Sequence, residues 1–263
     1  MTLQLVGVQA DMIWEDKPSS QARVRALLEA QSVREGALVV LPEMFATGFS
    51  LDVAKIAEVS GDGPTQRFMS QLAIELRSCV LGGVVTRDGT GKGCNEAVAY
   101  GPDGREIVRY RKLHPFTFGK ESDHYRAGDR TVRFSWRGFV IAPFICYDLR
   151  FPEVFRAEVC HGVDLIVVIA CWPEVRADHW RTLLKARAIE NQAFVVGVNR
   201  CGRDPNLNYS GDSRVIDPRG TMLCDTEDKE VAFSVDLDRQ IVDRYRNEFP
   251  VLPDMRPDFV AGP

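Results

Sequence analysis

Three ionisable residues of different chemical type each follow a short apolar or alternating run of the chain. Glu43 follows residues 37–41, Lys112 follows residues 106–111, and Cys146 follows residues 139–145. A carboxylate can take and return a proton, an ammonium can stabilise an oxyanion, and a thiol can attack a carbonyl carbon. Together these groups are sufficient for acyl transfer through a covalent intermediate. We therefore consider Glu43, Lys112 and Cys146 candidate catalytic residues.

The run before Cys146 predicts how its thiol is presented. Residues 139–145 are apolar and rich in β-branched side chains, which is typical of a strand buried on both faces. Pro152 then predicts the start of a helix, because proline suits the first helical turn. A strand-to-helix junction leaves backbone N–H groups free, so we expect the N–H of Tyr147 to bind a developing oxyanion. The alternative is that Cys146 is an ordinary buried cysteine.

The rest of the chain predicts strands that alternate with helices. Strand-like runs occupy residues 3–9, 37–41, 79–85, 95–100, 106–111, 139–145, 164–170, 194–199, 213–217, 221–223 and 230–235. Helix-like runs occupy residues 18–35, 64–77 and 178–191. This alternation predicts an α/β protein. Ligands of such proteins bind at the carboxyl ends of strands, which is where the three candidate residues lie.

Length and composition bound the function classes. The chain has 263 residues, of which 45% are hydrophobic, and no linker divides it, so we expect residues 1–263 to form one domain. A net charge of −4 argues against nucleic acid as a partner. No apolar run approaches the ~20 residues that cross a bilayer, and no secretory signal is visible at the start. We expect a cytoplasmic protein without a membrane partner.

Cysteine and histidine spacing predicts neither disulfides nor a metal site. The seven cysteines are Cys79, Cys94, Cys146, Cys160, Cys171, Cys201 and Cys224, with no CxxC pair among them. Several lie in apolar runs, which indicates reduced core thiols. The four histidines have no spacing typical of ligands. We expect no metal and no other cofactor.

Longer motifs around the same residues resemble those of a known superfamily. LPEMF contains Glu43, YRKLHPF contains Lys112, and CYDLRFPE contains Cys146. They resemble the motifs of the nitrilase, or carbon–nitrogen hydrolase, superfamily, and the chain is most similar to its omega-amidase branch. The resemblance runs nearly end to end and includes HWRTLLKARAIENQ and NRCGRDPNLNYSGDSRVIDPRG. It implies a four-layer αββα sandwich that forms a homodimer or a higher homo-oligomer.

The resemblance also implies a mechanism and a fourth residue. Glu121, in GKESDHY after the lysine motif, corresponds to a second glutamate that orients the lysine and the substrate. An exposed loop carboxylate is the alternative for this residue. Cys146 would attack the amide carbon, Lys112 would favour its thiolate and stabilise the oxyanion, and Glu43 would carry protons. The thioester would then be hydrolysed. Omega-amidases act on keto-acid amides such as 2-oxoglutaramate and 2-oxosuccinamate.

We expect the substrate pocket to include Trp172, Phe116 and the loop at residues 46–49. A substrate carboxylate needs a cation. The candidate cations are Arg150, Lys120, Arg126 and Arg176. For Arg150 the sequence favours an ion pair with Asp148 or Glu153 instead. The C-terminal residues 249–263 are rich in proline, and we expect them to pack on a partner subunit.

Several other functions use the same residues. An N-carbamoyl amidohydrolase or an aliphatic nitrilase would need the same triad, and a catalytically silent binding protein could keep the fold. A papain-type enzyme would instead pair Cys146 with a histidine, for which His114, His124 and His179 are available. The chain has Cys171 where close omega-amidase relatives often have asparagine, and Pro115 where they often have leucine. Both departures bear on the substrate more than on the mechanism.

Overall fold

The structure is a computed structural model that describes residues 2–256. The first of its two large β-sheets contains both parallel and antiparallel strands. The strand order is β15–β1–β2–β4–β5–β6, with β3 paired to β4. The bounds are β1 Thr2–Gln9, β2 Leu38–Val40, β3 Glu58–Val59, β4 Cys79–Arg87, β5 Gly93–Tyr100, β6 Glu106–Arg111 and β15 Val231–Asp238. Strands β1, β2 and β4 are parallel, and the two antiparallel steps from β4 through β5 return β6 to the same direction.

The second sheet has the order β14–β13–β10–β9–β8–β7, and β11 and β12 form a separate hairpin. The bounds are β7 Phe134–Trp136, β8 Phe139–Ile145, β9 Leu165–Ala170, β10 Phe194–Asn199, β11 Cys201–Arg203, β12 Asn208–Ser210, β13 Arg214–Ile216 and β14 Met222–Asp225. The central strands β8, β9 and β10 are parallel. Their side chains are almost all buried, as expected of parallel strands covered on both faces.

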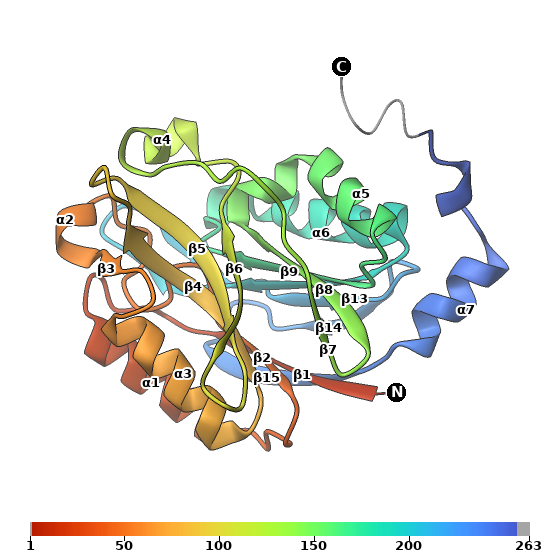
Figure 1. The fold of residues 1–263 in the computed structure, drawn as a ribbon, viewed down its shortest axis with the longest axis horizontal. Coiled ribbons are helices and arrows are strands. Elements are labelled where there is room, and N and C mark those ends of the chain that lie inside the picture. The colour runs from red at the N-terminus through yellow and green to blue at the C-terminus, as the bar shows by residue number, and fades with distance from the viewer. Residues whose placement is uncertain (1, 257–263) are drawn as a thin grey trace.

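Helices cover the outer face of each sheet. Helices α1 (Lys17–Glu29) and α3 (Pro64–Leu76) pack on the first sheet, and α5 (Pro152–Cys160) and α6 (Ala177–Asn191) on the second (Figure 1). Shorter helices are α2 (Val53–Ile56) and α4 (Glu121–His124), and α7 (Gln240–Glu248) follows β15. The α/β class and the four-layer αββα arrangement that were predicted are therefore confirmed.

Strand β1 shows how one sequence pattern builds two apolar layers. Leu3 and Leu5 belong to the core that contains the second sheet, whereas Val6 and Val8 pack with α1 and α3. Successive side chains of a strand point to opposite faces, so this alternation places the sheet between two hydrophobic layers. The two sheets and their helices are held together in this way.

One predicted helix was too long, and one observed helix was not predicted. The helix expected at residues 18–35 ends at Glu29, with Ala30 as its C-cap, and the chain then continues through turns in which the Gln31 N–H donates to the Leu28 carbonyl. Helix α7 was not predicted, because it is only nine residues long and mostly polar, with Val242 as its one fully buried side chain. The other long helices and the buried strands lie close to their predicted positions.

The C-terminal segment leaves the expectation of subunit packing open. Residues 257–263 lie outside the described part of the chain. In the described part, Phe249 is exposed, and its carbonyl oxygen accepts a hydrogen bond from Gln192 Nε2 at 2.7 Å. Packing on a partner remains a prediction. None of the helices within residues 2–256 has the length and apolar character to span a bilayer.

Candidate active site

The ends of three strands present the candidate catalytic residues. Lys112 directly follows β6, Cys146 directly follows β8, and Glu43 lies three residues beyond the end of β2. Strands β2 and β6 run in the same direction, so Glu43 and Lys112 emerge at the same edge of the first sheet. The side chains of Lys112 and Cys146 line one cavity.

Lys112 lies between two buried carboxylates. Its Nζ is 2.8 Å from Glu43 Oε1 and 2.8 Å from Glu121 Oε2. The Glu43 and Glu121 side chains are fully buried, and Lys112 is 1% exposed. Glu121 is the first residue of α4, where Lys120 with φ of +60° turns the chain inward. The alternative of an exposed loop carboxylate at position 121 was wrong.

Asn95 joins the two carboxylates and was not predicted as a site residue. Its Nδ2 donates to Glu43 Oε1 at 2.7 Å and to Glu121 Oε1 at 2.9 Å. Both donations go to acceptors, so the amide fixes the spacing of two like charges that would otherwise repel each other. Asn95 stands beside Glu96 near the start of β5, and nothing else in the sequence marked it.

The backbone around Glu43 fixes the direction of its carboxylate. Glu43 Oε2 accepts a hydrogen bond from the backbone N–H of Cys171 at 2.8 Å. Gly83 of β4 lies against the other side, where a Cβ atom would be 2.6 Å from the Glu43 Cα. Met44 has a φ of +45°, so the chain turns sharply after Glu43. The carboxylate is thus held from the second sheet and the first.

Cys146 has a strained backbone conformation. Its φ of +46° is left-handed, which costs a non-glycine residue roughly 1–2 kcal/mol. The residue begins a 3₁₀ helix, Cys146–Arg150, and its side chain is partly exposed to the cavity. The N–H of Tyr147 lies in the first turn of this helix, where no intrahelical acceptor is available. It is therefore placed to donate to an oxyanion.

The charges of the cluster favour a protonated thiol. Burial alone would lower the pKa of Lys112, but Glu121 and Glu43 more than offset this and raise the pKa well above its usual range. Burial and the negative charge of Glu43 raise the pKa of Cys146 well above that of a free thiol, and Lys112 only partly opposes them. Lys112 does favour the thiolate, as expected, because its charge lowers the pKa of Cys146, but burial and Glu43 outweigh it, so the thiol rests protonated.

The cavity above Cys146 is lined mainly by aromatic side chains. Its aromatic lining comprises Phe49, Phe116, Tyr147, Trp172 and Tyr209. Phe116 and Trp172 were predicted to line this pocket, and so was the loop at residues 46–49 that carries Phe49. Tyr209 and Leu207, from the β11–β12 hairpin region, were not predicted.

Two arginines at this cavity have no acidic partner among residues 2–256. The guanidinium of Arg150 lies 4.7 Å from the ring centre of Trp172, and that of Arg176 lies 5.4 Å from the ring centre of Phe116. Burial lowers the pKa of Arg150, and the positive charge of Arg176 adds to this. Lys120 and Arg126 do not line the cavity.

The favoured interpretation of Arg150, an ion pair with Asp148 or Glu153, was wrong. The Asp148 carboxylate points inward and accepts hydrogen bonds from the Tyr110 hydroxyl at 2.7 Å and the Ile145 N–H at 3.0 Å. Arg150 instead has a polar contact with His179 Nδ1 at 3.2 Å. Its guanidinium therefore keeps donors available for a ligand.

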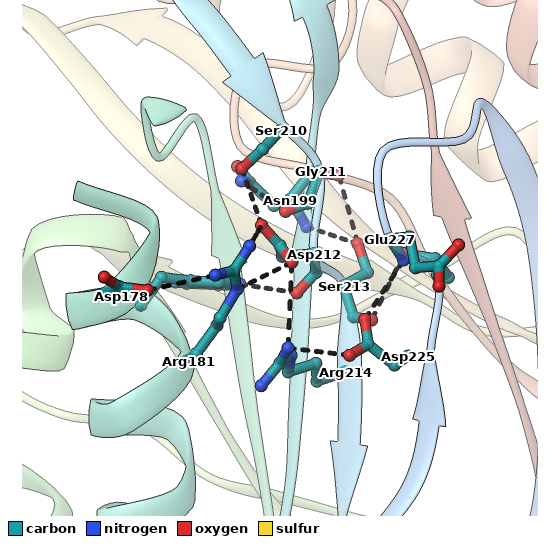
Figure 2. Close-up of polar contacts among 12 residues, drawn as sticks. Asp178, Arg181, Asn199, Ser210, Gly211, Asp212, Ser213, Arg214, Asp225 and Glu227 are labelled. Atoms are coloured by element: carbon teal, nitrogen blue, oxygen red, sulfur yellow. Dashed lines mark hydrogen bonds and ion pairs between the residues drawn. The ribbon is translucent and has the colours of Figure 1, made fainter. Parts of the chain in front are cut away.

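A polar network behind the cavity holds the backbone of Trp172. Asn199, at the end of β10, accepts from the Trp172 N–H at 2.7 Å and donates to the Trp172 carbonyl at 3.0 Å. The same amide donates to the Gly211 carbonyl, and Asp212 beside it accepts two hydrogen bonds from Arg181 (Figure 2). This network fixes the pocket wall from behind.

The histidines do not support a papain-type pairing. His114 stacks on Phe151 and lies 2.8 Å from Asp148 Oδ1, and neither His124 nor His179 lines the cavity. Within the described residues, no hydrogen bond joins a histidine to Cys146. No group of three or more potential metal ligands is present in that part of the chain either.

Comparisons with known proteins identify relatives that span almost the whole chain. The carbon–nitrogen hydrolase family model matches residues 7–247. "Omega-amidase YafV" of Yersinia enterocolitica is 36% identical over 255 residues, covering 96% of each chain. "2-oxoglutaramate amidase" of Bacillus subtilis is 32% identical over 244 residues, covering 92% of this chain and 93% of the relative.

A solved structure of similar sequence has the same fold. It is a CN-hydrolase superfamily protein of Xanthomonas campestris that carries an arsenic adduct in its active site. The two structures superpose with a TM-score of 0.92 at 36% identity, over 97% of this chain and 98% of the other.

Proposed function

The chain belongs to the carbon–nitrogen hydrolase family, and on that basis we propose that it is an omega-amidase. It hydrolyses the terminal amide of small keto-acid amides, 2-oxoglutaramate and 2-oxosuccinamate, to the 2-oxo acid and ammonia. The observation that carries this proposal is the buried Glu43–Lys112–Glu121 cluster beside Cys146, at a cavity that Arg150 and Arg176 also line. Relatives named for this activity support it.

The first half of the reaction follows from a thiol that rests protonated. Glu43 takes the proton of Cys146 as the sulfur attacks the amide carbon, so no free thiolate has to accumulate. Lys112 Nζ and the N–H of Tyr147 stabilise the oxyanion. Each such donor contributes about 3–4 kcal/mol in other hydrolases. Glu43 then gives its proton to the departing nitrogen, and ammonia leaves.

The second half uses the same carboxylate again. Glu43 takes a proton from a water molecule, which attacks the thioester carbon, and the collapse of the second oxyanion releases the acid and restores the Cys146 thiol. Glu121 holds Lys112 in position through both halves, because its two oxygens lie 3.1 and 2.8 Å from Nζ. Lys112 stays charged throughout, as its raised pKa indicates.

We assign the free carboxylate of the substrate to Arg150 and Arg176. Two guanidinium groups without acidic partners repel each other, and a bound carboxylate removes that repulsion. The aromatic rings of Trp172 and Phe116 beneath them restrict their orientation and would contact the short carbon chain.

The same proposal extends to the assembly. The chain acts as one domain over residues 1–263, works in the cytoplasm, and forms a homodimer or a higher homo-oligomer. Sedimentation of the purified protein tests the assembly, and a purely monomeric species would contradict it.

An ammonia-release screen tests the function. The substrates are 2-oxoglutaramate, 2-oxosuccinamate, glutaramate, N-carbamoyl amino acids and simple aliphatic nitriles. We expect the two keto-acid amides to have the highest kcat/KM. If nitriles or carbamoyl compounds are turned over equally well, the omega-amidase assignment is wrong.

A further inference from the structure

A second thiol lies beside the proposed nucleophile and has no part in the reaction described above. Cys171 directly follows β9 and lines the same cavity as Cys146. Its side chain is otherwise buried. Its N–H donates to Glu43 Oε2 at 2.8 Å, and its Sγ lies 3.2 Å from the Glu43 carbonyl oxygen. The backbone of Cys171 thus contacts the Glu43 carboxylate, and its thiol contacts the Glu43 backbone.

The strand register sets the separation of the two cysteines. Strands β8 and β9 are parallel neighbours with Ile145 paired to Ile169, so Cys171 lies one residue beyond the position level with Cys146. Neighbouring strands are about 4.8 Å apart, so the two cysteines leave adjacent strand ends and face one cavity. Disulfides join Cα atoms that are about 4.4–6.8 Å apart, a range that includes this strand spacing.

We propose that Cys146 and Cys171 form a peroxide-sensitive pair, in which a reversible disulfide closes the active site and protects the nucleophile. The inference rests on the proposed role of Cys146 as the exposed nucleophile of the cavity. The other cysteines in the cores, such as Cys79 and Cys201, do not line this cavity.

The chemistry balances with a peroxide as the only oxidant. The Cys146 sulfur attacks one peroxide oxygen, the O–O bond breaks, and water or an alcohol leaves, so that Cys146 becomes a sulfenic acid. The Cys171 sulfur then displaces the hydroxyl group, the S–S bond forms, and water leaves with the Cys171 proton. The two sulfurs lose two electrons in total, and the peroxide gains two.

Glu43 can serve both steps as the proton acceptor. Both thiols have raised pKa values, because of burial and then the charge of Glu43, so neither reacts as a free thiolate. The charge of the Glu43 carboxylate acts on both thiols, and we assign to it the proton of each sulfur as that sulfur attacks. Without Cys171, the sulfenic acid would remain open to a second peroxide, and the sulfinic acid that results is not reduced by thiols.

Mass spectrometry of the peroxide-treated protein tests the pair without relying on amidase activity. We expect the wild-type chain to lose the mass of two hydrogen atoms and to yield a peptide that joins Cys146 to Cys171. Dithiothreitol should then restore at least about nine-tenths of the untreated state. The Cys171→Ser and Cys171→Ala variants should instead gain two oxygen atoms at Cys146 and recover less than about one-tenth.

The matched control is Cys160→Ser, which removes an exposed thiol outside the cavity and should leave the Cys146–Cys171 peptide unchanged. Circular dichroism before treatment establishes that each variant is folded. Sulfinic acid at Cys146 in the wild-type chain with Cys171 still reduced, a different partner for Cys146, or no reaction at Cys146 would each overturn the inference. Crosslinking in a protein that hydrolyses no amide would overturn the proposed function alone.

Discussion

At the scale of single residues, the site is a balance of charges that the fold keeps out of water. Glu43 and Glu121 carry two negative charges against the one positive charge of Lys112. The remaining negative charge disfavours a thiolate at Cys146, so the account requires proton transfer during attack rather than before it. This makes Glu43 more than an orienting group.

The arginine pair gives a prediction about substrate binding. Arg150→Leu and Arg176→Leu should each raise the KM for 2-oxoglutaramate by about 10- to 100-fold, as expected for the loss of one charge-assisted contact. Steady-state kinetics should show a much smaller change for an uncharged amide such as butyramide. Arg130→Leu, at an exposed arginine away from the cavity, is the control. Equal effects on both substrates would contradict the assignment.

Asn95 gives a prediction about positioning. Asn95→Ala removes the amide that holds Glu43 and Glu121 at a fixed spacing, and we expect kcat to fall by about 10- to 100-fold with little change in KM. Asn95→Asp adds a third carboxylate to the cluster and should lower kcat further. Steady-state rates of ammonia release measure both. An unchanged kcat in the alanine variant would show that the amide has no positioning role.

At the scale of elements, tight backbone turns at strand ends deliver the reactive groups. Met44 after β2, Lys120 before α4 and Cys146 after β8 all have positive φ values. Such conformations cost residues with side chains free energy, and the surrounding structure must supply it. The site is therefore built by the turns as much as by the strands.

Gly83 gives a prediction at this scale. A Cβ at this position would lie 2.3 Å from the Met44 nitrogen, so Gly83→Ala must displace the turn that carries Glu43. We expect about 1–3 kcal/mol lower stability and a loss of activity greater than the loss of folded protein. Gly89→Ala is the matched control, because a Cβ there meets nothing within 4 Å. Denaturant unfolding and kcat measure the two effects, and a fully active Gly83→Ala variant would contradict them.

How far the sequence predicted these elements depended on their burial. Strands β8 and β10 are continuous apolar runs, and the predicted bounds of 139–145 and 194–199 are the observed ones. Helix α7 is short and mostly polar, and its position depends on contacts with distant residues such as the hydrogen bond from Arg246 to the Val163 carbonyl. Local pattern therefore predicted the core strands but not the elements fixed by tertiary contacts.

For the active site, too, local sequence predicted some residues, whereas others depend on tertiary contacts. Motifs placed Glu43, Lys112, Glu121 and Cys146 in advance, and the structure brings the first three into contact, while their catalytic roles remain a prediction. Arg176 was one of four candidate cations, and only the folded chain separates it from Lys120 and Arg126, which do not line the cavity. The contacts of Asn95 depend on where separate strands and loops meet, so the local sequence did not identify it. Proximity in sequence suggested Asp148 or Glu153 as a partner for Arg150, but Asp148 points inward and Glu153 is exposed without an ion pair to Arg150.

At the scale of the whole molecule, the two sheets enclose thiols that the unfolded chain would expose. Burial raises the pKa of Cys79, Cys146 and Cys171, and that of Cys201 to about 12. A thiol of the unfolded chain has a pKa of about 8.5. Above that pH the unfolded state loses protons that the folded state retains, so stability falls as the pH rises.

This decrease of stability with rising pH gives a prediction about the free energy of unfolding. The contribution of each buried thiol is fully present below about pH 8.5 and is lost above it by about 1.4 kcal/mol per pH unit. Cys201→Ala removes one such group, and its free energy of unfolding should fall less steeply than that of the wild type between about pH 9 and 10. Denaturant titrations across this range measure the slope. An identical slope in the variant would contradict the prediction, whatever the offset between the two curves.

The central claim is that one carboxylate, one ammonium and one thiol act together on an amide carbon. The most direct measurement is kcat/KM for ammonia release from 2-oxoglutaramate by Glu43→Gln, Lys112→Met and Cys146→Ser, beside wild type and the exposed control Glu29→Gln. The account predicts that each of the three falls by at least about 10³-fold and that the control keeps the wild-type value. More than about one-tenth of the wild-type kcat/KM in any of the three folded variants would contradict it.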